Sequence, residues 1–185
     1  IRDAQESRGL GDVYKRQEYG IVTAAALQSV GIKARVLALK TRDVEQVKSS
    51  AGHVLAEAYI DNLEKWIMLD GQYNIIPMLN DIPLNAVEFQ RAIIEKQKFK
   101  LVNIFGEVSS KSKKSYTKFI PYYLYYFDIN FDNREKFDKK MNKINGKRKL
   151  MLVPIGAKFP KIFQRKYPID YCEYTSNIKD FYRKP

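Results

Sequence analysis

The only histidine of this 185-residue chain, His53, begins an alternating segment, and Asp70 ends the next one. Between the two segments lies Asp61-Asn62, a pair that tolerates positive φ and suits a two-residue primed turn. This pattern predicts a hairpin in which residues 53–60 pair with residues 63–70, with His53 facing Asp70 on one side of the sheet. A four-residue loop would make them diagonal neighbours within reach, whereas an odd shift would place them on opposite faces.

The His53–Asp70 pair has the chemistry of a general base with an orienting group. A carboxylate beside an imidazole fixes the tautomer of the ring and stabilises its protonated form, as proton transfer in acyl-transfer reactions requires. The alternative is a lone histidine in an ordinary hydrogen bond, which is the usual interpretation of such a pair taken by itself. The segments that must position the pair decide between these interpretations.

The segments before the hairpin have the pattern of a buried helix followed by a strand. Apolar residues recur at helical spacing from Glu18 to Val30, and we expect one stripe of them to be buried: Tyr19, Val22, Ala26 and Val30. Gly31 is a natural residue to end this helix. The apolar run Ala34 to Leu39 predicts a strand, and the polar stretch Lys40 to Ala51 predicts a surface loop bordering the site.

Several motifs from Glu18 to Gln72 resemble the core of transglutaminase-like cysteine acyl-transfer domains. In order they are Glu-Tyr-Gly at 18–20, an Ala/Leu-rich helix, Gly-Ile-Lys-Ala-Arg-Val at 31–36, Gly-His-Val-Leu-Ala-Glu-Ala-Tyr at 52–59 and Lys-Trp-Ile-Met-Leu-Asp at 65–70. The resemblance implies a helix packed on a small antiparallel sheet, with His53 as the base and Asp70 as its orienting partner. Lys33 and Gly71 stand where the family usually has proline.

The nucleophile is the serious departure from the family pattern. Counting back from Gly31, the resemblance places a cysteine near Arg16, where the chain has none. A cysteine at a helix start would have its thiolate stabilised by the positive end of the helix dipole. Cys172, the only cysteine, has acidic and aromatic neighbours that would not lower a thiol pKa, so we expect a packed side chain rather than a nucleophile.

Residues 1–17 resemble a translated sequencing adaptor. The transposase mosaic end used in library preparation encodes Asp-Val-Tyr-Lys-Arg-Gln, as at 12–17, and the preceding adaptor bases encode Ser-Arg-Gly-Leu-Gly, as at 7–11. We therefore leave residues 1–17 out of fold reasoning and expect the native reading frame to begin at about Glu18. On this hypothesis the cysteine was cut away upstream. The competing hypothesis is a true pseudoenzyme with Arg16 in the nucleophile position.

Composition excludes some site classes and leaves others open. One Cys and one His rule out the usual Cys/His zinc sites and an internal disulfide, and we expect no metal or cofactor. The sequence contains no run of about 18 apolar residues, so it predicts no transmembrane helix. The net charge is +12, but the lysines are scattered, so nucleic-acid binding is not favoured. An anionic cell-surface partner, with a location in the cell envelope or outside it, is slightly favoured.

The segments after the hairpin predict a loop, a helix and a strand. Gln72 to Pro83 contains two prolines and predicts a loop. Asn85 with Glu88 predicts a capping box that opens a helix to about Lys98. Residues 82–88 are also similar to the segment after the core in a bacterial branch of the family, although ordinary capping explains them equally well. Phe99 to Phe105 predicts a strand.

The last part of the chain predicts a mixed extension. Val108 to Ser115, rich in Ser and Lys, is the expected linker. The aromatic run within Tyr116 to Phe131 favours core packing over a platform for sugars or nucleic acid. Residues 132–149 are highly charged and predict a solvated excursion. Leu150 to Pro154 and Tyr171 to Thr175 predict strands.

We therefore expect an α+β fold, with an N-terminally truncated transglutaminase-like core over residues 18–108 and a strand-rich extension over residues 109–185, itself open to truncation. The expected function is that of a fragment of a cysteine enzyme acting on peptide or carboxamide bonds of a protein or peptide substrate through a Cys-His-Asp triad. As given, the chain is expected to be inactive. The alternative is a non-catalytic binding module on the same scaffold, at the cell surface. Substrate identity and oligomeric state stay open.

Overall fold

The computed structural model describes residues 18–131 and 146–185. The hypothesis on residues 1–17 and the part of the predicted excursion 132–149 that covers residues 132–145 lie outside these ranges. At its end the excursion is wrong, because Lys149 begins a strand of the main sheet. No helix in the described part of the chain is long and apolar enough to cross a membrane.

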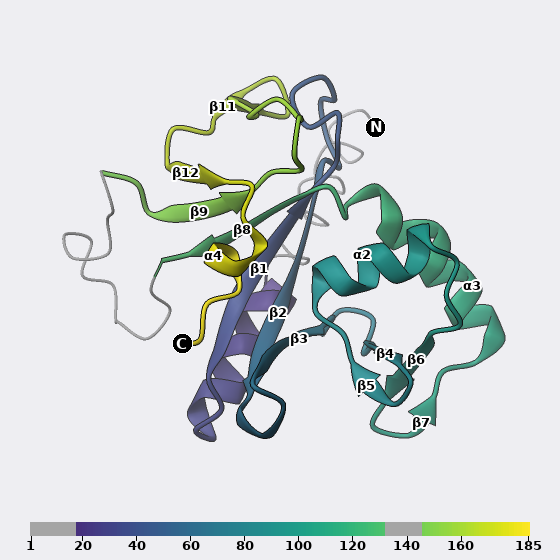
Figure 1. Cartoon of the computed structure of the whole chain (residues 1–185). Helices are drawn as coiled ribbons and strands as arrows, with labels where there is room; N and C mark the ends of the chain where they lie inside the picture. The colour runs from purple at the N-terminus through teal and green to yellow at the C-terminus, as the bar shows by residue number, and fades with distance from the viewer. Residues whose placement is uncertain (1–17, 132–145) are drawn as a thin grey trace, which may run out of the picture.

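The largest element is a six-stranded sheet with the strand order β12-β9-β8-β1-β2-β3 (Figure 1). Its strands are β1 (Ala34–Lys40), β2 (Gly52–Ile60), β3 (Lys65–Leu69), β8 (Tyr126–Asn130), β9 (Lys149–Leu152) and β12 (Cys172–Thr175). All neighbours are antiparallel except β9 and β12, which pair in parallel. The predicted α+β class is therefore confirmed. The sheet takes strands from both sides of residue 108, and the expected domain division at that point stays a prediction.

A second, four-stranded sheet has the order β5-β4-β6-β7. It contains β4 (Ile76–Leu79), β5 (Ile82–Pro83), β6 (Lys100–Asn103) and β7 (Gly106–Glu107). The strand predicted over residues 99–105 is confirmed as β6, but the loop predicted over residues 72–83 is wrong where β4 and β5 form. Pro77 obscured β4 in the sequence, yet its carbonyl oxygen still accepts a hydrogen bond from the Leu84 amide at 2.9 Å. A small hairpin of β10 (Ile162–Phe163) and β11 (Tyr167–Pro168) completes the strands.

Helix α2 (Ala86–Ile94) begins as predicted. Asn85 is its N-cap, and the reciprocal hydrogen bonds of a capping box join Asn85 and Glu88 at 2.8 and 2.9 Å. The helix ends before the predicted Lys98 because Lys96 has a φ of +54°, which a right-handed helix does not allow.

The linker predicted over residues 108–115 is wrong, because residues 110–115 belong to helix α3 (Ser110–Phe119). The serines that suggested a linker begin the helix instead: the Ser109 hydroxyl accepts a hydrogen bond from the Ser112 amide at 3.2 Å. Helix α3 leads into η2 (Ile120–Tyr122). The aromatic run after it is largely core, as predicted, since Tyr123, Tyr126 and Phe127 are buried.

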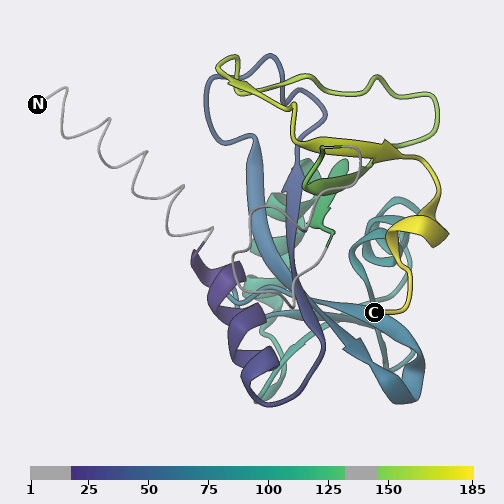
Figure 2. The ribbon, with the colours of Figure 1, turned by 90° about the vertical axis from the view of Figure 1, so that its left-hand side faces the viewer.

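Each face of the six-stranded sheet has its own cover, as the side view in Figure 2 shows. Helices α2 and α3 pack against the face that carries Leu37, Leu55 and Met68. The helix over residues 18–29 packs on the other face. There Ala24 of the helix contacts Ala34 of β1 and Ala56 of β2. The two faces are therefore covered by different elements.

The helix over residues 18–29 is present as predicted, but its orientation is not. The residues expected to be buried are exposed: Tyr19, Val22, Ala26 and Val30. The buried side is made of Gly20 and Ala24, because the helix approaches the sheet closely: a Cβ added at Gly20 would lie 2.8 Å from Val54 Cγ1. Gly31 ends the helix with a φ of +83°, as predicted.

The C-terminal segment is bound to the face of the sheet that carries Leu37 and Leu55. It is held there by hydrogen bonds to the buried ion pair of Arg35 and Glu57. Arg35 Nε and Nη2 donate to Glu57 Oε2 at 2.9 and 2.6 Å, and Arg35 Nη1 donates to the Phe181 carbonyl oxygen at 3.0 Å. The Tyr182 hydroxyl donates to Glu57 Oε1 at 3.0 Å. Helix α4 (Ile178–Phe181) is held in place by these contacts.

Candidate active site

The hairpin that carries the candidate residues has a four-residue loop rather than the predicted two-residue turn. Ile60 pairs with Lys65, and η1 (Asp61–Leu63) with Glu64 in the left-handed region closes the loop. The prediction of a primed turn at Asp61-Asn62 is wrong, because these residues form a single turn of 3-10 helix. The change of register is even, so every side chain keeps its predicted face and His53 and Asp70 become diagonal neighbours.

His53 and Asp70 are in contact. His53 Nε2 lies 2.7 Å from Asp70 Oδ2, and both side chains are fully buried. The second oxygen of Asp70 accepts hydrogen bonds from the amides of Gln72 and Tyr73 at 3.2 and 3.4 Å. Reciprocal backbone hydrogen bonds between Asp70 and Ile75 fix the chain just beyond β3. The carboxylate is therefore held in one orientation by its own turn.

Tyr116 of α3 is a further hydrogen-bond partner of Asp70. The sequence did not single it out. Its hydroxyl donates to Asp70 Oδ2 at 2.9 Å. Burial raises the pKa of Tyr116 well above its usual value, and the negative charge of Asp70 adds to this rise, so the phenol keeps its proton and acts as a donor. In the sequence, Tyr116 was only the first residue of an aromatic run.

The other imidazole nitrogen of His53 is buried and has no hydrogen-bond partner in the described part of the chain. Because Nε2 faces a carboxylate, it carries the proton of the neutral ring, and Nδ1 is left as an acceptor. The centroid of the ring lies 5.3–6.0 Å from those of three aromatic side chains: Tyr73, Phe119 and Tyr123. The accepting nitrogen of His53 is therefore not used by the described part of the fold.

The start of the helix over residues 18–29 lies beside the strands that carry this pair. A Cβ added at Gly20 would meet Val54, the residue after His53. One added at Gly71, the residue after Asp70, would lie 3.5 Å from the Tyr19 carbonyl oxygen. The absence of side chains at the two glycines lets the first turn of the helix reach both segments. The first turn of the helix, from Glu18 to Gly20, therefore lies close to the segments that carry His53 and Asp70.

Cys172 is not part of this site. It lies in β12 opposite Lys149, in the cluster that fills the other face of the sheet with Val44 and Tyr126. Its side chain is buried, and burial raises the pKa of its thiol. The expectation of a packed cysteine is confirmed.

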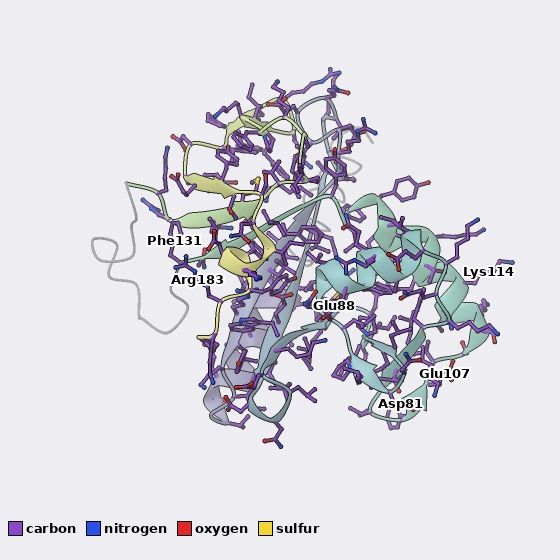
Figure 3. All side chains as sticks on the ribbon, in the orientation of Figure 1. Asp81, Glu88, Glu107, Lys114, Phe131 and Arg183 are labelled. Atoms are coloured by element: carbon purple, nitrogen blue, oxygen red, sulfur yellow. The ribbon has the colours of Figure 1, made fainter. Side chains whose placement is uncertain are left out.

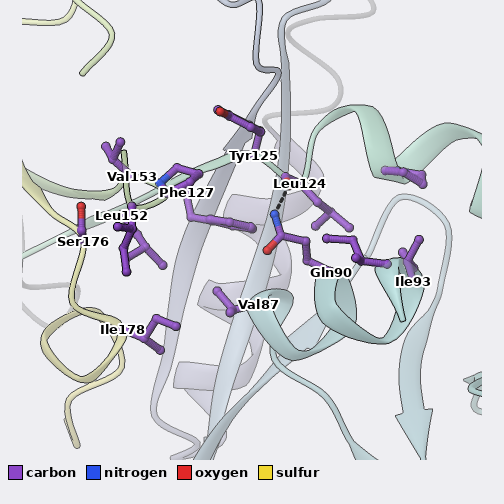
Figure 4. Close-up of a pocket in the computed structure, with 14 residues that line it drawn as sticks. Val87, Gln90, Ile93, Leu124, Tyr125, Phe127, Leu152, Val153, Ser176 and Ile178 are labelled. Atoms are coloured by element: carbon purple, nitrogen blue, oxygen red, sulfur yellow. Dashed lines mark hydrogen bonds between the residues drawn. The ribbon is translucent and has the colours of Figure 1, made fainter. Parts of the chain in front are cut away.

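Two cavities adjoin the segment after α3. One, of about 880 Å³, lies between residues 41–50 and η2, and its lining includes Phe119 and Tyr123, whose rings contact His53. The other, of about 560 Å³, is mostly apolar and lies between α2, Leu124 and the residues after β9 (Figure 4). In it, Gln90 Nε2 donates to the Leu124 carbonyl oxygen at 2.5 Å. The first cavity therefore adjoins two of the aromatic rings around His53, although His53 does not itself line it.

The described residues contain no group of three or more His, Cys, Asp or Glu side chains arranged to hold a metal ion. The side chains gathered around His53 are instead those of proton transfer: an imidazole, a carboxylate and a phenol. The chemistry that they support is acid–base catalysis.

Comparison with known proteins gives one family model that covers part of the chain. The family model of the transglutaminase-like superfamily matches residues 15–71, which include β1, β2, His53 and Asp70. The matched region also includes position 16, where this chain has arginine. No curated protein and no solved structure matches the chain significantly. Residues 15–71 of this chain are therefore similar to the transglutaminase-like superfamily.

Proposed function

We propose that this scaffold is that of a cysteine acyl-transfer enzyme, in which His53 transfers the proton and Asp70 orients its ring. We further propose that the 185-residue chain is itself inactive. Its one cysteine lies in β12, with three strands between it and the strand of His53, and the position near residue 16 that the nucleophile would occupy has arginine. A His–Asp pair without a nucleophile cannot form an acyl-enzyme.

In the proposed reaction, a cysteine thiolate at the start of the helix attacks the carbonyl carbon of a carboxamide or peptide bond. The C–S bond forms, the C–N bond breaks, and the nitrogen leaves as ammonia or an amine with a proton from the His53 imidazolium. Water or a second amine then attacks the thioester, His53 takes its proton, and the thiolate leaves. The product is a carboxylic acid or a new amide.

The observation that carries the proposal is the state of the His53 ring. Its Nε2 is bound to Asp70 at 2.7 Å while its buried Nδ1 has no partner among the described residues. Most buried side-chain nitrogens and oxygens have a hydrogen-bond partner, because an unpaired buried acceptor costs about 1–3 kcal/mol. An acceptor held open beside a helix start is what a cysteine thiol would require of its base.

The proposal is tested by restoring the nucleophile. We would make Arg16→Cys and Gln17→Cys, each in a Cys172→Ser background, and measure ammonia release and hydroxylamine incorporation with a glutamine-containing peptide. One of the two variants is expected to be active, and adding His53→Ala is expected to reduce that activity by at least about a hundredfold. The unmodified chain is the matched control and is expected to show no activity.

The thiol pKa provides a second readout that needs no substrate. In the active variant, alkylation by iodoacetamide is expected to persist at a pH well below the ordinary pKa of a thiol, because His53 and the helix dipole stabilise the thiolate. Loss of this low-pH reactivity in the His53→Ala variant supports the pair as the activating group. Equal alkylation profiles with and without His53, together with no turnover, would contradict the proposal.

The alternative is a non-catalytic binding module on the same scaffold. Arg16 within the matched region and the position of Cys172 in β12, away from His53, favour it. If neither cysteine variant is active and genuine coding sequence runs through Arg16 and Gln17, the binding module becomes the better account.

A further inference from the structure

The tip of the β6–β7 hairpin exposes two large apolar side chains. Ile104 and Phe105 are 83% and 87% exposed. They lie side by side at the end of the four-stranded sheet, where Asn103 pairs with Gly106. The fold does not remove these two large apolar side chains from water. An adjacent pair of this kind at a loop tip is a candidate contact surface for a partner.

The turn holds these side chains outward. Asn103 Oδ1 accepts a hydrogen bond from the Phe105 amide at 2.8 Å, and Gly106 closes the turn with a φ of +108°. β6 is in turn paired with β4, so the tip projects from a formed sheet. Ile104 and Phe105 are therefore presented by a shaped hairpin.

The segments before and after the hairpin are strongly basic in sequence. Residues 96–118 contain seven lysines and one acidic residue, Glu107. Lys111, Lys114 and Lys118 recur on one face of α3, are exposed, and have no ion-pair partner in the described part of the chain. Helix α3 begins directly after β7, and Figure 3 shows Lys114 and Glu107 at the same edge of the molecule.

We propose that this edge is a peripheral docking surface for an anionic lipid bilayer. Ile104 and Phe105 enter the interfacial region, and the lysines of α3 bind the headgroup phosphates. Both aliphatic and aromatic side chains partition into the interfacial region of a bilayer, and anionic headgroups attract lysines nearby. An anionic bilayer therefore matches both the apolar tip and the basic helix. Single-stranded nucleic acid would use the lysines and the ring of Phe105 but gains little from Ile104. The proposal does not depend on the His53–Asp70 chemistry.

The test is co-sedimentation of the full 185-residue protein with vesicles of phosphatidylcholine alone or mixed with phosphatidylglycerol. We expect binding to the mixed vesicles that weakens with salt, and at least about tenfold weaker binding to phosphatidylcholine alone. The double variant Ile104→Ser/Phe105→Ser is expected to lose at least about tenfold in affinity. Ile155→Ser is the matched control, because Ile155 is 90% exposed elsewhere on the molecule, and it is expected to bind normally.

The lysines are tested in the same way. The double variant Lys111→Ser/Lys114→Ser is expected to weaken vesicle binding by about fivefold per lysine. The control is the double variant Lys166→Ser/Lys179→Ser, which removes the same charge away from the tip. This control is expected to have a clearly smaller effect. Equal losses from the two pairs would mean that net charge alone attracts the protein, and would overturn the docking surface.

Insertion has its own readout. Phe105→Cys, labelled with an environment-sensitive dye in a Cys172→Ser background, is expected to give a blue-shifted and stronger emission on anionic vesicles. The same label at Ile155→Cys is expected to give no change. No vesicle binding at low salt, or binding without a shift at residue 105, would overturn the proposal. A preference for single-stranded DNA that depends on Lys111 and Lys114 but not on the tip would assign the surface to nucleic acid instead.

Discussion

The Tyr116 hydroxyl donates a 2.9 Å hydrogen bond to the same Asp70 oxygen that lies 2.7 Å from His53 Nε2. Tyr116 and Asp70 are 46 residues apart in the chain, so this contact joins α3 to the end of β3. A buried carboxylate needs several donors, and Asp70 obtains them from an imidazole, a phenol and two amides. The orientation of His53 therefore depends on an element outside the matched region.

Replacing Tyr116 by phenylalanine is expected to lower the free energy of unfolding by about 1.5–3 kcal/mol, because a buried hydrogen bond to a charged group is lost without a change of shape. Urea unfolding at neutral pH measures this. Tyr122→Phe is the control, since Tyr122 is exposed, and it is expected to change stability by less than about 0.5 kcal/mol. Equal stabilities of the two variants would mean that the Tyr116–Asp70 bond is not part of the fold's support.

Replacing Glu57 by glutamine is expected to lower the free energy of unfolding by about 3–5 kcal/mol, because Arg35 would stay buried without a counter-charge. Arg35 and Glu57 have side chains that are almost fully inaccessible. The control is Glu64→Gln, which breaks an exposed pair with Lys184 and is expected to cost less than about 1 kcal/mol. Chemical unfolding followed by circular dichroism compares the two, and similar losses would contradict the expected difference.

Replacing Gly20 by alanine tests the close approach of the helix to the sheet. At an open helix position this change gains up to about 1 kcal/mol, but here the new Cβ would lie 2.8 Å from Val54 Cγ1 and 3.0 Å from Leu55 backbone atoms. We expect a net loss of about 1–3 kcal/mol in the free energy of unfolding. Ser29→Ala, at an exposed position of the same helix, is the control and is expected to be neutral or stabilising. A stabilised Gly20→Ala protein would show that the helix packs less closely.

The candidate pair could be predicted from the sequence because alternation along a strand fixes which face a side chain takes. His53 and Asp70 share a face for any even register, so the wrong turn at Asp61-Asn62 did not separate them. The register itself was not predictable, since η1 depends on Glu64 adopting a left-handed conformation that its residue type does not suggest.

Contacts that depend on the close approach of distant elements could not be predicted from the sequence. Tyr116 comes after a Ser- and Lys-rich stretch whose composition suits a linker and a helix N-terminus equally well. The buried face of the helix over residues 18–29 was mistaken because hydrophobicity pointed to Val22, whereas packing selected the small residues Gly20 and Ala24. Hydrophobic periodicity finds the helix, but the distance to the sheet decides which side is buried.

The second face of the sheet contains a buried charge cluster in which Lys40 and Lys149 share one carboxylate, Asp128. Two cations to one anion leave an excess of positive charge. Burial lowers the pKa of Lys40 to about 7, and the charge of Lys149 adds to this effect. In the unfolded chain the same group has its ordinary pKa of 10.5. Between these values the unfolded state binds more protons, so the free energy of unfolding rises with pH.

We expect the stability of the protein to increase by about 1–2 kcal/mol from pH 7 to about pH 8.5 through Lys40, since each pH unit contributes at most about 1.4 kcal/mol. Lys40→Met is expected to remove most of this rise and to be the more stable protein near pH 6, because it leaves Asp128 and Lys149 as a balanced pair. Lys33→Met is the control: Lys33 is partly exposed and paired with Asp61, and this variant is expected to keep the rise. Urea unfolding midpoints across this range measure both, and an unchanged slope in Lys40→Met would refute the assignment to Lys40.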